Sequence, residues 1–199
     1  ENELGHPAAM QGDHWKNYRA NEKRPLGLKE RGFEFVAEME RLGMIVDVSH
    51  LSDDGFFDLC EHATKPFVAS HSNSRAMCGH RRNLTDEMLR AVGEKGGVVG
   101  LNFYSAFLTE KKERAGLEML AEHAKRMIRM AGEDAVALGT DFDGFERKDL
   151  PEKLEGAERI ELVWDAFQKA GITSRQTEKI AYGNLFRVIE AGCGKTSVS

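Results

Sequence analysis

Residues 117–141 read LEMLAEHAKRMIRMAGEDAVALGTD, which is a helix, a strand and a polar stop in succession. Apolar residues recur at the helical period over 117–131, and Gly132 follows as a helix-ending residue. The short apolar run 135–138 and the polar residues 139–141 are typical of a buried parallel strand and its carboxyl end. This stretch therefore predicts one helix-strand unit.

The same unit occurs three more times before residue 117. The predicted pairs of helix and strand are 28–42 with 44–48, 53–63 with 66–69, and 85–95 with 98–101. Polar residues follow each strand: Ser49-His50, Ser70-His71 and Asn102-Phe103-Tyr104. Two further amphipathic helices are predicted around 160–167 and 180–188, and no strand follows them.

Alternating helices and strands predict an α/β protein with a parallel sheet, and a doubly wound sheet and a barrel are both open. Polar residues at every strand end favour a barrel, but a (β/α)8 barrel needs about 250 residues. We therefore expect the C-terminal half of a (β/α)8 TIM-type barrel, with about four parallel strands. The chain starts at Glu1 rather than Met, so we expect the gene product to begin upstream. The expected parts are a polar loop at 1–27, the half barrel at 28–191 and a flexible tail at 192–199.

Composition narrows the class of protein. The chain has 199 residues, 41% of them apolar, and a net charge of −5, which is typical of a globular protein without a nucleic-acid partner. No stretch approaches about 18 uninterrupted apolar residues, so we expect no membrane segment. The three cysteines are far apart, which argues against a disulfide framework and a thiolate zinc site. The cellular location stays open, with a slight preference for the cytoplasm.

His50 and His71 are the first candidate site residues. They follow consecutive strands, whose carboxyl ends meet at the same edge of the sheet, so two neutral imidazoles could bind one metal ion there. The competing interpretation is a pair of hydrogen-bonded loop residues. For the other histidines we favour structural or solvent-exposed roles: His6, His14, His62 and His123.

Charged side chains near the strand ends supply the other candidates. Asp141 could act as the base that takes a proton from an activated water, or it could be a turn residue that caps nearby amides, a role for which Asp143 is the better candidate. Asp47 could orient an imidazole or accept backbone hydrogen bonds. Arg82 suits bidentate capture of a carboxylate, although a loop arginine is often only solvated. The sequence has no phosphate-binding glycine loop and no G-x-S-x-G elbow, so nucleotide chemistry and covalent catalysis have no support.

Five ordered motifs go beyond a general pattern. They are Asp47-Val48-Ser49-His50-Leu51-Ser52, Ser70-His71-Ser72-Asn73-Ser74, Arg81-Arg82-Asn83-Leu84, Gly97-Val98-Val99-Gly100-Leu101-Asn102-Phe103-Tyr104 and Gly139-Thr140-Asp141-Phe142-Asp143-Gly144. Together they resemble the membrane, or renal, dipeptidase family of zinc peptidases. The resemblance runs from about Gly27 to Ala191.

The resemblance implies a barrel enzyme with two zinc ions that hydrolyses dipeptides with a metal-activated water. It implies that His50 and His71 bind zinc, that Asp141 handles the proton of the water, and that Arg82 holds the terminal carboxylate of the substrate. We also expect Tyr104 to contact the substrate. The family's other zinc ligands, a His-x-Asp and a bridging glutamate, have no counterpart in this chain.

Three hypotheses follow. The first is a zinc dipeptidase of which this chain is an incomplete C-terminal half, inactive alone. The second is a non-catalytic half barrel that forms a homo-oligomer or pairs with the missing N-terminal half, because its sheet edges would be exposed. The third is another barrel metallohydrolase, which would need His50 and His71 but not Arg82.

Overall fold

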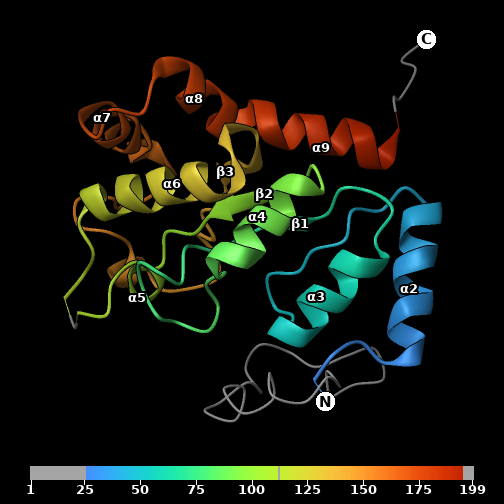
Figure 1. The fold of residues 1–199 in the computed structure, drawn as a ribbon. Coiled ribbons are helices and arrows are strands. Elements are labelled where there is room, and N and C mark those ends of the chain that lie inside the picture. Colours follow the sequence, from blue (N-terminus) through green and yellow to red (C-terminus); the bar gives the residue numbers. More distant parts are fainter. Residues whose placement is uncertain (1–25, 112, 195–199) are drawn as a thin grey trace.

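The structure is a computed structural model that describes residues 26–111 and 113–194 (Figure 1), so the expected loop 1–27 and tail 192–199 lie mostly outside it. The α-helices are α2 (Glu30–Arg41), α3 (Asp53–His62), α4 (Asp86–Glu94), α5 (Ser105–Leu108), α6 (Leu117–Ala131), α7 (Glu161–Lys169), α8 (Ser174–Glu178) and α9 (Asn184–Cys193). The strands are β1 (Val68–Ala69), β2 (Val98–Leu101) and β3 (Val136–Leu138). A π-helical turn, Lys179–Gly183, joins α8 to α9. The helix α9 thus extends into the segment that was expected to be a tail.

Local signals explain where the helices begin and end. The side chain of Thr85 accepts a hydrogen bond from the Met88 amide at 3.2 Å, which confirms it as the N-cap of α4. The helices α2 and α6 are followed by Gly43 and Gly132, whose φ angles of 74° and 91° lie in the region that favours glycine. Thr173 and Gln176 form a capping box at the start of α8.

The three strands form a parallel sheet in the order β1-β2-β3, with Val68 opposite Val98 and Val99 opposite Val136. Helices connect the successive strands, so the predicted α/β class with a parallel sheet is confirmed. Two short runs, 66–69 and 135–138, are strands over fewer residues than predicted.

The prediction of a strand at 44–48 is wrong, because the segment makes only an isolated parallel bridge between Asp47 and Val68. Two ladder hydrogen bonds form, from the Val48 amide to the Val68 carbonyl at 2.8 Å and from the Val68 amide to the Val46 carbonyl at 2.9 Å. The next donor in the ladder, the Ser70 amide, bonds instead to the Asp47 carboxylate at 2.9 Å. A side chain therefore replaces the backbone acceptor, and the ladder ends there.

The sheet is buried on both faces. Alternate residues such as Phe67, Val99 and Leu101 pack into the main core with α3, α4 and α6. On the other face Val68, Val98 and Ala137 pack against Val188 of α9. Figure 1 shows α9 above the sheet and α3 below it, with α4 overlapping the strands in this view.

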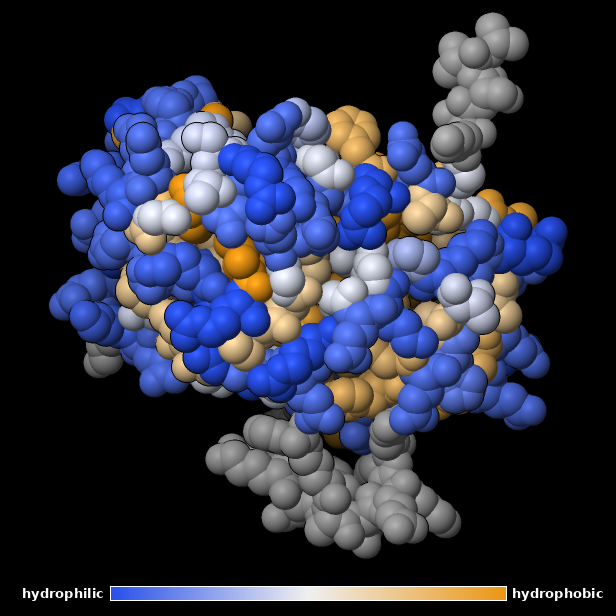
Figure 2. All heavy atoms as spheres, turned by 45° about the horizontal axis from the view of Figure 1, so that its top comes forward, coloured by the Kyte–Doolittle hydropathy of each residue, from blue (hydrophilic) through white to orange (hydrophobic). Residues whose placement is uncertain are grey.

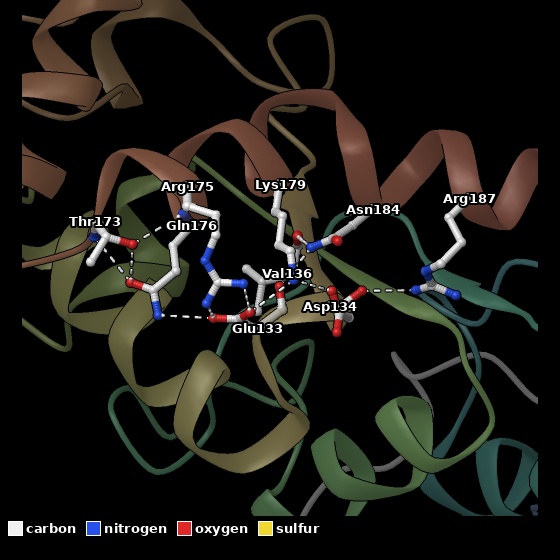
Figure 3. Close-up of polar contacts among 9 residues, drawn as sticks. All are labelled: Glu133, Asp134, Val136, Thr173, Arg175, Gln176, Lys179, Asn184 and Arg187. Atoms are coloured by element: carbon white, nitrogen blue, oxygen red, sulfur yellow. Dashed lines mark hydrogen bonds and ion pairs between the residues drawn. The ribbon is translucent and has the colours of Figure 1, made fainter.

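Polar side chains fix the C-terminal helices to the start of β3 (Figure 3). Asn184 donates to the carbonyls of Glu133 and Val136 at 2.8 and 2.7 Å, and Arg187 donates to the carbonyls of Gly96 and Asp134 at 2.6 and 2.8 Å. Lys179 forms an ion pair with Glu133 at 2.8 Å. These contacts hold α9 at the amino ends of β2 and β3.

The outer side of the π-helical turn and α9 carries an apolar stripe at helical spacing. Tyr182, Leu185, Phe186 and Ile189 are 39% to 59% exposed, at positions that share one side of the helical segment. Figure 2 brings the top of Figure 1 forward and shows apolar patches among charged residues on this side. Within the described ranges no helix is both long and apolar enough to cross a membrane.

His123 is a structural residue inside α6, as the sequence suggested. Its ring is fully buried, its Nδ1 accepts a hydrogen bond from the Ser74 amide at 3.2 Å, and its Nε2 bonds to the Leu108 carbonyl at 3.1 Å. A carbonyl can only accept, so Nε2 carries the proton. Burial lowers the pKa of His123 to about 4, although the bond to Leu108 opposes this shift.

We expect His123 to make the stability of the fold sensitive to acid. The unfolded chain takes up the imidazole proton near pH 6.5 but the folded chain only near pH 4, so the free energy of unfolding falls as the pH drops through this window. The loss is about 3 kcal/mol by pH 4. Urea unfolding of His123→Gln should show a shallower pH dependence, whereas the exposed His62→Gln should retain the wild-type slope. Equal slopes in all three proteins would contradict this role.

Candidate metal and substrate site

The predicted site residues gather at the carboxyl ends of the strands. His50 and His71 lie just beyond the 44–48 segment and β1. The backbones of β2 and β3 come close to Ser70 at this level: a Cβ atom at Gly100 or at Gly139 would lie 2.0 Å from the Ser70 carbonyl oxygen. Only glycine fits at these two positions, and the close approach draws the strand ends together.

The structure brings His50 and His71 into direct contact. Their Nε2 atoms are 3.0 Å apart and their ring centroids 5.0 Å apart. Two nitrogen ligands on a tetrahedral zinc, each about 2.0 to 2.1 Å from the metal, lie about 3.3 Å from each other. The pair therefore fits two positions of a zinc site after a shift of a few tenths of an ångström.

Hydrogen bonds behind the pair determine which nitrogen of His71 carries a proton. The Asp47 carboxylate accepts a short hydrogen bond from the Ser70 hydroxyl, and this hydroxyl lies 2.7 Å from Nδ1 of His71. Because the hydroxyl proton points to Asp47, Ser70 accepts from Nδ1–H of His71. The tautomer with a free lone pair on Nε2 is thereby favoured, which is the form that binds a metal.

The surroundings of Asp47 and His50 shift the pKa values of both side chains. Partial burial raises the pKa of Asp47, but hydrogen bonds from Ser70 and Ser49 outweigh it and leave the pKa below its usual value. Burial lowers the pKa of His50, and the positive charge of Arg82 lowers it further. At neutral pH Asp47 is thus a carboxylate and His50 is a neutral imidazole.

The pair alone does not complete a catalytic zinc site, which normally has three protein ligands and a water. In the part of the chain that the structure describes, no group of three or more His, Cys, Asp or Glu residues is arranged to hold a metal ion.

Arg82 lies beside the histidine pair. Its Nε donates to the carbonyl of Ser49 at 2.9 Å, and its guanidinium carbon is 5.5 Å from the centre of the Phe107 ring. Its Nη2 is buried without a hydrogen-bond partner in the described ranges. Burial lowers the pKa of Arg82, and the charges of Asp141 and Asp47 oppose this shift. The side chain thus has donors available for an anion.

Phe107 connects Arg82 to Tyr104. The Tyr104 ring meets Phe107 edge to face at 4.9 Å and lies against Phe145 at the same centroid distance. His80 packs on Phe107 at 4.5 Å, and its Nδ1 accepts from the Arg82 amide at 3.2 Å. Tyr104 and Arg82 therefore both contact the Phe107 ring, which brings Tyr104 close to the Arg82 loop.

Asp141 points back toward the end of β2. Its Oδ2 accepts from the side chain of Asn102 at 3.0 Å, and its backbone has a φ of 59°. Its charge acts on both His50 and Arg82, so it shares one electrostatic environment with them. Asp143, two residues on, is exposed at the surface of the loop.

Sequence reasoning gave no role to Ser70, Asn102 or Phe107, although each is in contact with a predicted site residue. Ser70 and Asn102 stood in the polar stops after their strands, which was the available signal. Phe107 had none, because it lies on the short helix α5, which the sequence pattern did not predict.

The comparisons with known proteins agree on one family. The model of the family described as "Membrane dipeptidase (Peptidase family M19)" matches residues 8–194. An uncharacterized protein from the pqqA 5′ region of Klebsiella pneumoniae is 38% identical over 167 residues, which cover 82% of this chain and 60% of that protein. An uncharacterized dipeptidase of Schizosaccharomyces pombe is 35% identical over 81% of this chain and 39% of its own length.

A solved structure shares both fold and sequence with this chain. The metallo peptidase of Rhodobacter sphaeroides, liganded with a phosphinate mimic of the dipeptide L-Ala-D-Ala, is 34% identical and superposes with a TM-score of 0.78. The match covers 83% of this chain and 47% of that one. The present chain thus spans between about 39% and 60% of these relatives.

We expect His71 to lose its preference for one tautomer in Ser70→Ala. Without the hydroxyl, Nδ1–H loses its acceptor, and the imidazole should divide between its two neutral forms. Imidazole nitrogen chemical shifts of the metal-free chain measure this directly. Ser72→Ala is a matched control, because the buried Ser72 hydroxyl has no hydrogen-bond partner in the described residues. An unchanged His71 spectrum in Ser70→Ala would refute the proposed orientation.

Proposed function

Because the chain belongs to the membrane dipeptidase family, we propose that it is part of a zinc-dependent dipeptidase that hydrolyses small dipeptides. The observation that carries this proposal is the pair of facing Nε2 atoms, 3.0 Å apart, together with the Ser70 and Asp47 side chains that favour the metal-binding tautomer of His71. Histidines that bind a metal usually donate their other ring N–H to a group of this kind, which is itself held by a carboxylate.

We assign the metal to His50 and His71, which would contribute two of its ligands. When bound, zinc would supply a Lewis acid that activates water and polarises the scissile carbonyl. By resemblance to the family, a second zinc ion and the remaining ligands belong to residues outside those described. The mixed positive and negative charges around the pair suit a substrate that carries both an amino and a carboxylate group.

The other residues would bind the dipeptide and move a proton. Arg82 would hold the terminal carboxylate with the guanidinium donors that Ser49 leaves free. Asp141 would take a proton from the attacking water and return it to the leaving amine. Phe107 contacts both the Tyr104 ring and the Arg82 guanidinium group. Tyr104 would therefore line the end of the substrate that Arg82 holds. The dipeptide mimic on the Rhodobacter sphaeroides relative is a ligand of this chemical class.

We expect Arg82→Lys, in the intact gene product, to lose most of the preference for a free carboxylate. Lysine keeps the charge but loses the paired hydrogen bonds, so kcat/KM for a dipeptide should fall. The expected rise in the corresponding activation free energy is about 1.5 to 3 kcal/mol. The same dipeptide with a C-terminal amide should lose much less.

The neighbouring exposed Arg81→Lys is the matched control and should retain the wild-type preference. Equal discrimination between acid and amide in wild type and Arg82→Lys would remove Arg82 from the substrate site. Activity toward other amide substrates, without a need for a free carboxylate, would favour a different barrel metallohydrolase.

We further propose that residues 28–191 form the C-terminal half of a (β/α)8 barrel, which associates with its N-terminal half or with a second copy. Two observations support this: the chain spans about half of its solved relative, and the π-helical turn and α9 together expose the apolar stripe of Tyr182, Leu185, Phe186 and Ile189. An exposed stripe of this kind marks an interaction surface.

We expect this chain alone to self-associate in light scattering, and Phe186→Ser to weaken that association because it removes a large apolar side chain from the stripe. Glu190→Gln, at another exposed position of α9, is the control and should leave the oligomeric state unchanged. The non-catalytic interpretation would gain support if the intact gene product had no dipeptidase activity. A chain that stays monomeric at all concentrations would contradict association with a second copy.

A further inference from the structure

Asn102 occupies an unusual position between two parts of the site. It follows β2, its side chain is fully buried, and its Nδ2 donates to Oδ2 of Asp141 at 3.0 Å. Its Oδ1 accepts from the Tyr104 amide at 2.6 Å. One amide group thus contacts both the residue proposed to move a proton and the backbone of the residue proposed to line the substrate.

The two contacts allow only one orientation of the Asn102 amide. If the group were flipped, its NH2 would face the Tyr104 N–H, and its oxygen would face the Asp141 carboxylate. Both pairings are repulsive, donor against donor and acceptor against acceptor. The Asn102 donor is therefore directed at Asp141 by the surrounding backbone.

The backbone of Asn102 is itself held by a second buried asparagine. The side chain of Asn73 donates to the Asn102 carbonyl and accepts from the Asn102 amide, each at 2.9 Å. Asn83 in turn accepts from the Asn73 amide at 3.2 Å. All three asparagines are fully buried, so this network cannot easily rearrange to follow a moving carboxylate.

Asp141 has few other constraints. In the described residues, Asn102 is the side chain that hydrogen-bonds to its carboxylate, and Oδ1 has no such partner. The carboxylate also lies over Gly144, where a Cβ atom would be 2.1 Å from Oδ1. Asn102 thus holds one oxygen, and among the described residues no side chain holds the other.

We propose that Asn102 is the positioning residue of Asp141: it holds Oδ2 so that Oδ1 is presented for proton transfer. This inference rests on the proposed role of Asp141 in the dipeptidase. Asn102 does not touch substrate or metal in this assignment, and it acts on the reaction through the orientation of one carboxylate.

The test uses Asn102→Asp in the zinc-loaded, intact gene product. This variant keeps the shape of the side chain and the acceptor for Tyr104 but replaces the donor with a second carboxylate. We expect kcat to fall about 10- to 100-fold, while KM and zinc content stay within about twofold of wild type. In an Asp141→Asn background the same change should lower kcat less than about twofold further.

The outcomes are distinct. If Asn102→Asp lowers kcat by the same factor in both backgrounds, it acts on the fold and the inference is overturned. An Asp141→Asn variant with wild-type kcat would instead overturn the proposed function of Asp141.

A second readout does not depend on activity or on the folding of an Asn102 variant. In Asp141→Asn, the side-chain amide protons of Asn102 should move upfield in the NMR spectrum, because a charged acceptor has become neutral. Asp143→Asn, in the same loop, is the control and should leave them unchanged. Unchanged resonances in Asp141→Asn would overturn the inference.

Discussion

The Asp47 carboxylate determines both where backbone pairing at the edge of the sheet ends and how the His71 ring is oriented. It takes the Ser70 amide out of the ladder between β1 and the 44–48 segment, and it accepts a hydrogen bond from the Ser70 hydroxyl at the same time. The hydroxyl is thereby held at Nδ1 of His71, whose other nitrogen faces His50. Loss of this carboxylate would free a backbone donor and an imidazole together, so structural and chemical roles are not separable at this residue.

Periodicity and local caps predicted the fold well where contacts are local. The stripe over 117–131 coincides with α6, and Thr85 caps α4 as expected. The contact between His50 and His71 was also predictable, because parallel strands bring their carboxyl ends to one edge. The failure at 44–48 has a different origin: whether that segment pairs as a strand depends on a side chain that competes for a backbone donor, which no pattern of apolar residues reports.

The residues behind the site escaped sequence reasoning for the same reason. Ser70, Asn102 and Phe107 act through partners in other segments, so their type and spacing alone give no role. The buried asparagines Asn73 and Asn83 show this most clearly, since their amides join loops that follow different strands. Such a satisfied polar layer specifies one arrangement of the loops, whereas an apolar layer would tolerate several.

The amino ends of the strands anchor α9, whereas the carboxyl ends hold the histidine pair. Asn184 and Arg187 bind backbone carbonyls near the amino ends of β2 and β3, and they use no group of the histidine pair at the opposite ends. Their acceptors are main-chain oxygens, which every amino acid supplies. These hydrogen bonds therefore do not depend on the side chains at the acceptor positions, although Glu133 also pairs with Lys179 and a Cβ atom at Gly97 would lie 2.2 Å from the Phe67 carbonyl oxygen. An engineer could change residues around the histidine pair at one end of the strands while leaving the support of α9 at the other end untouched.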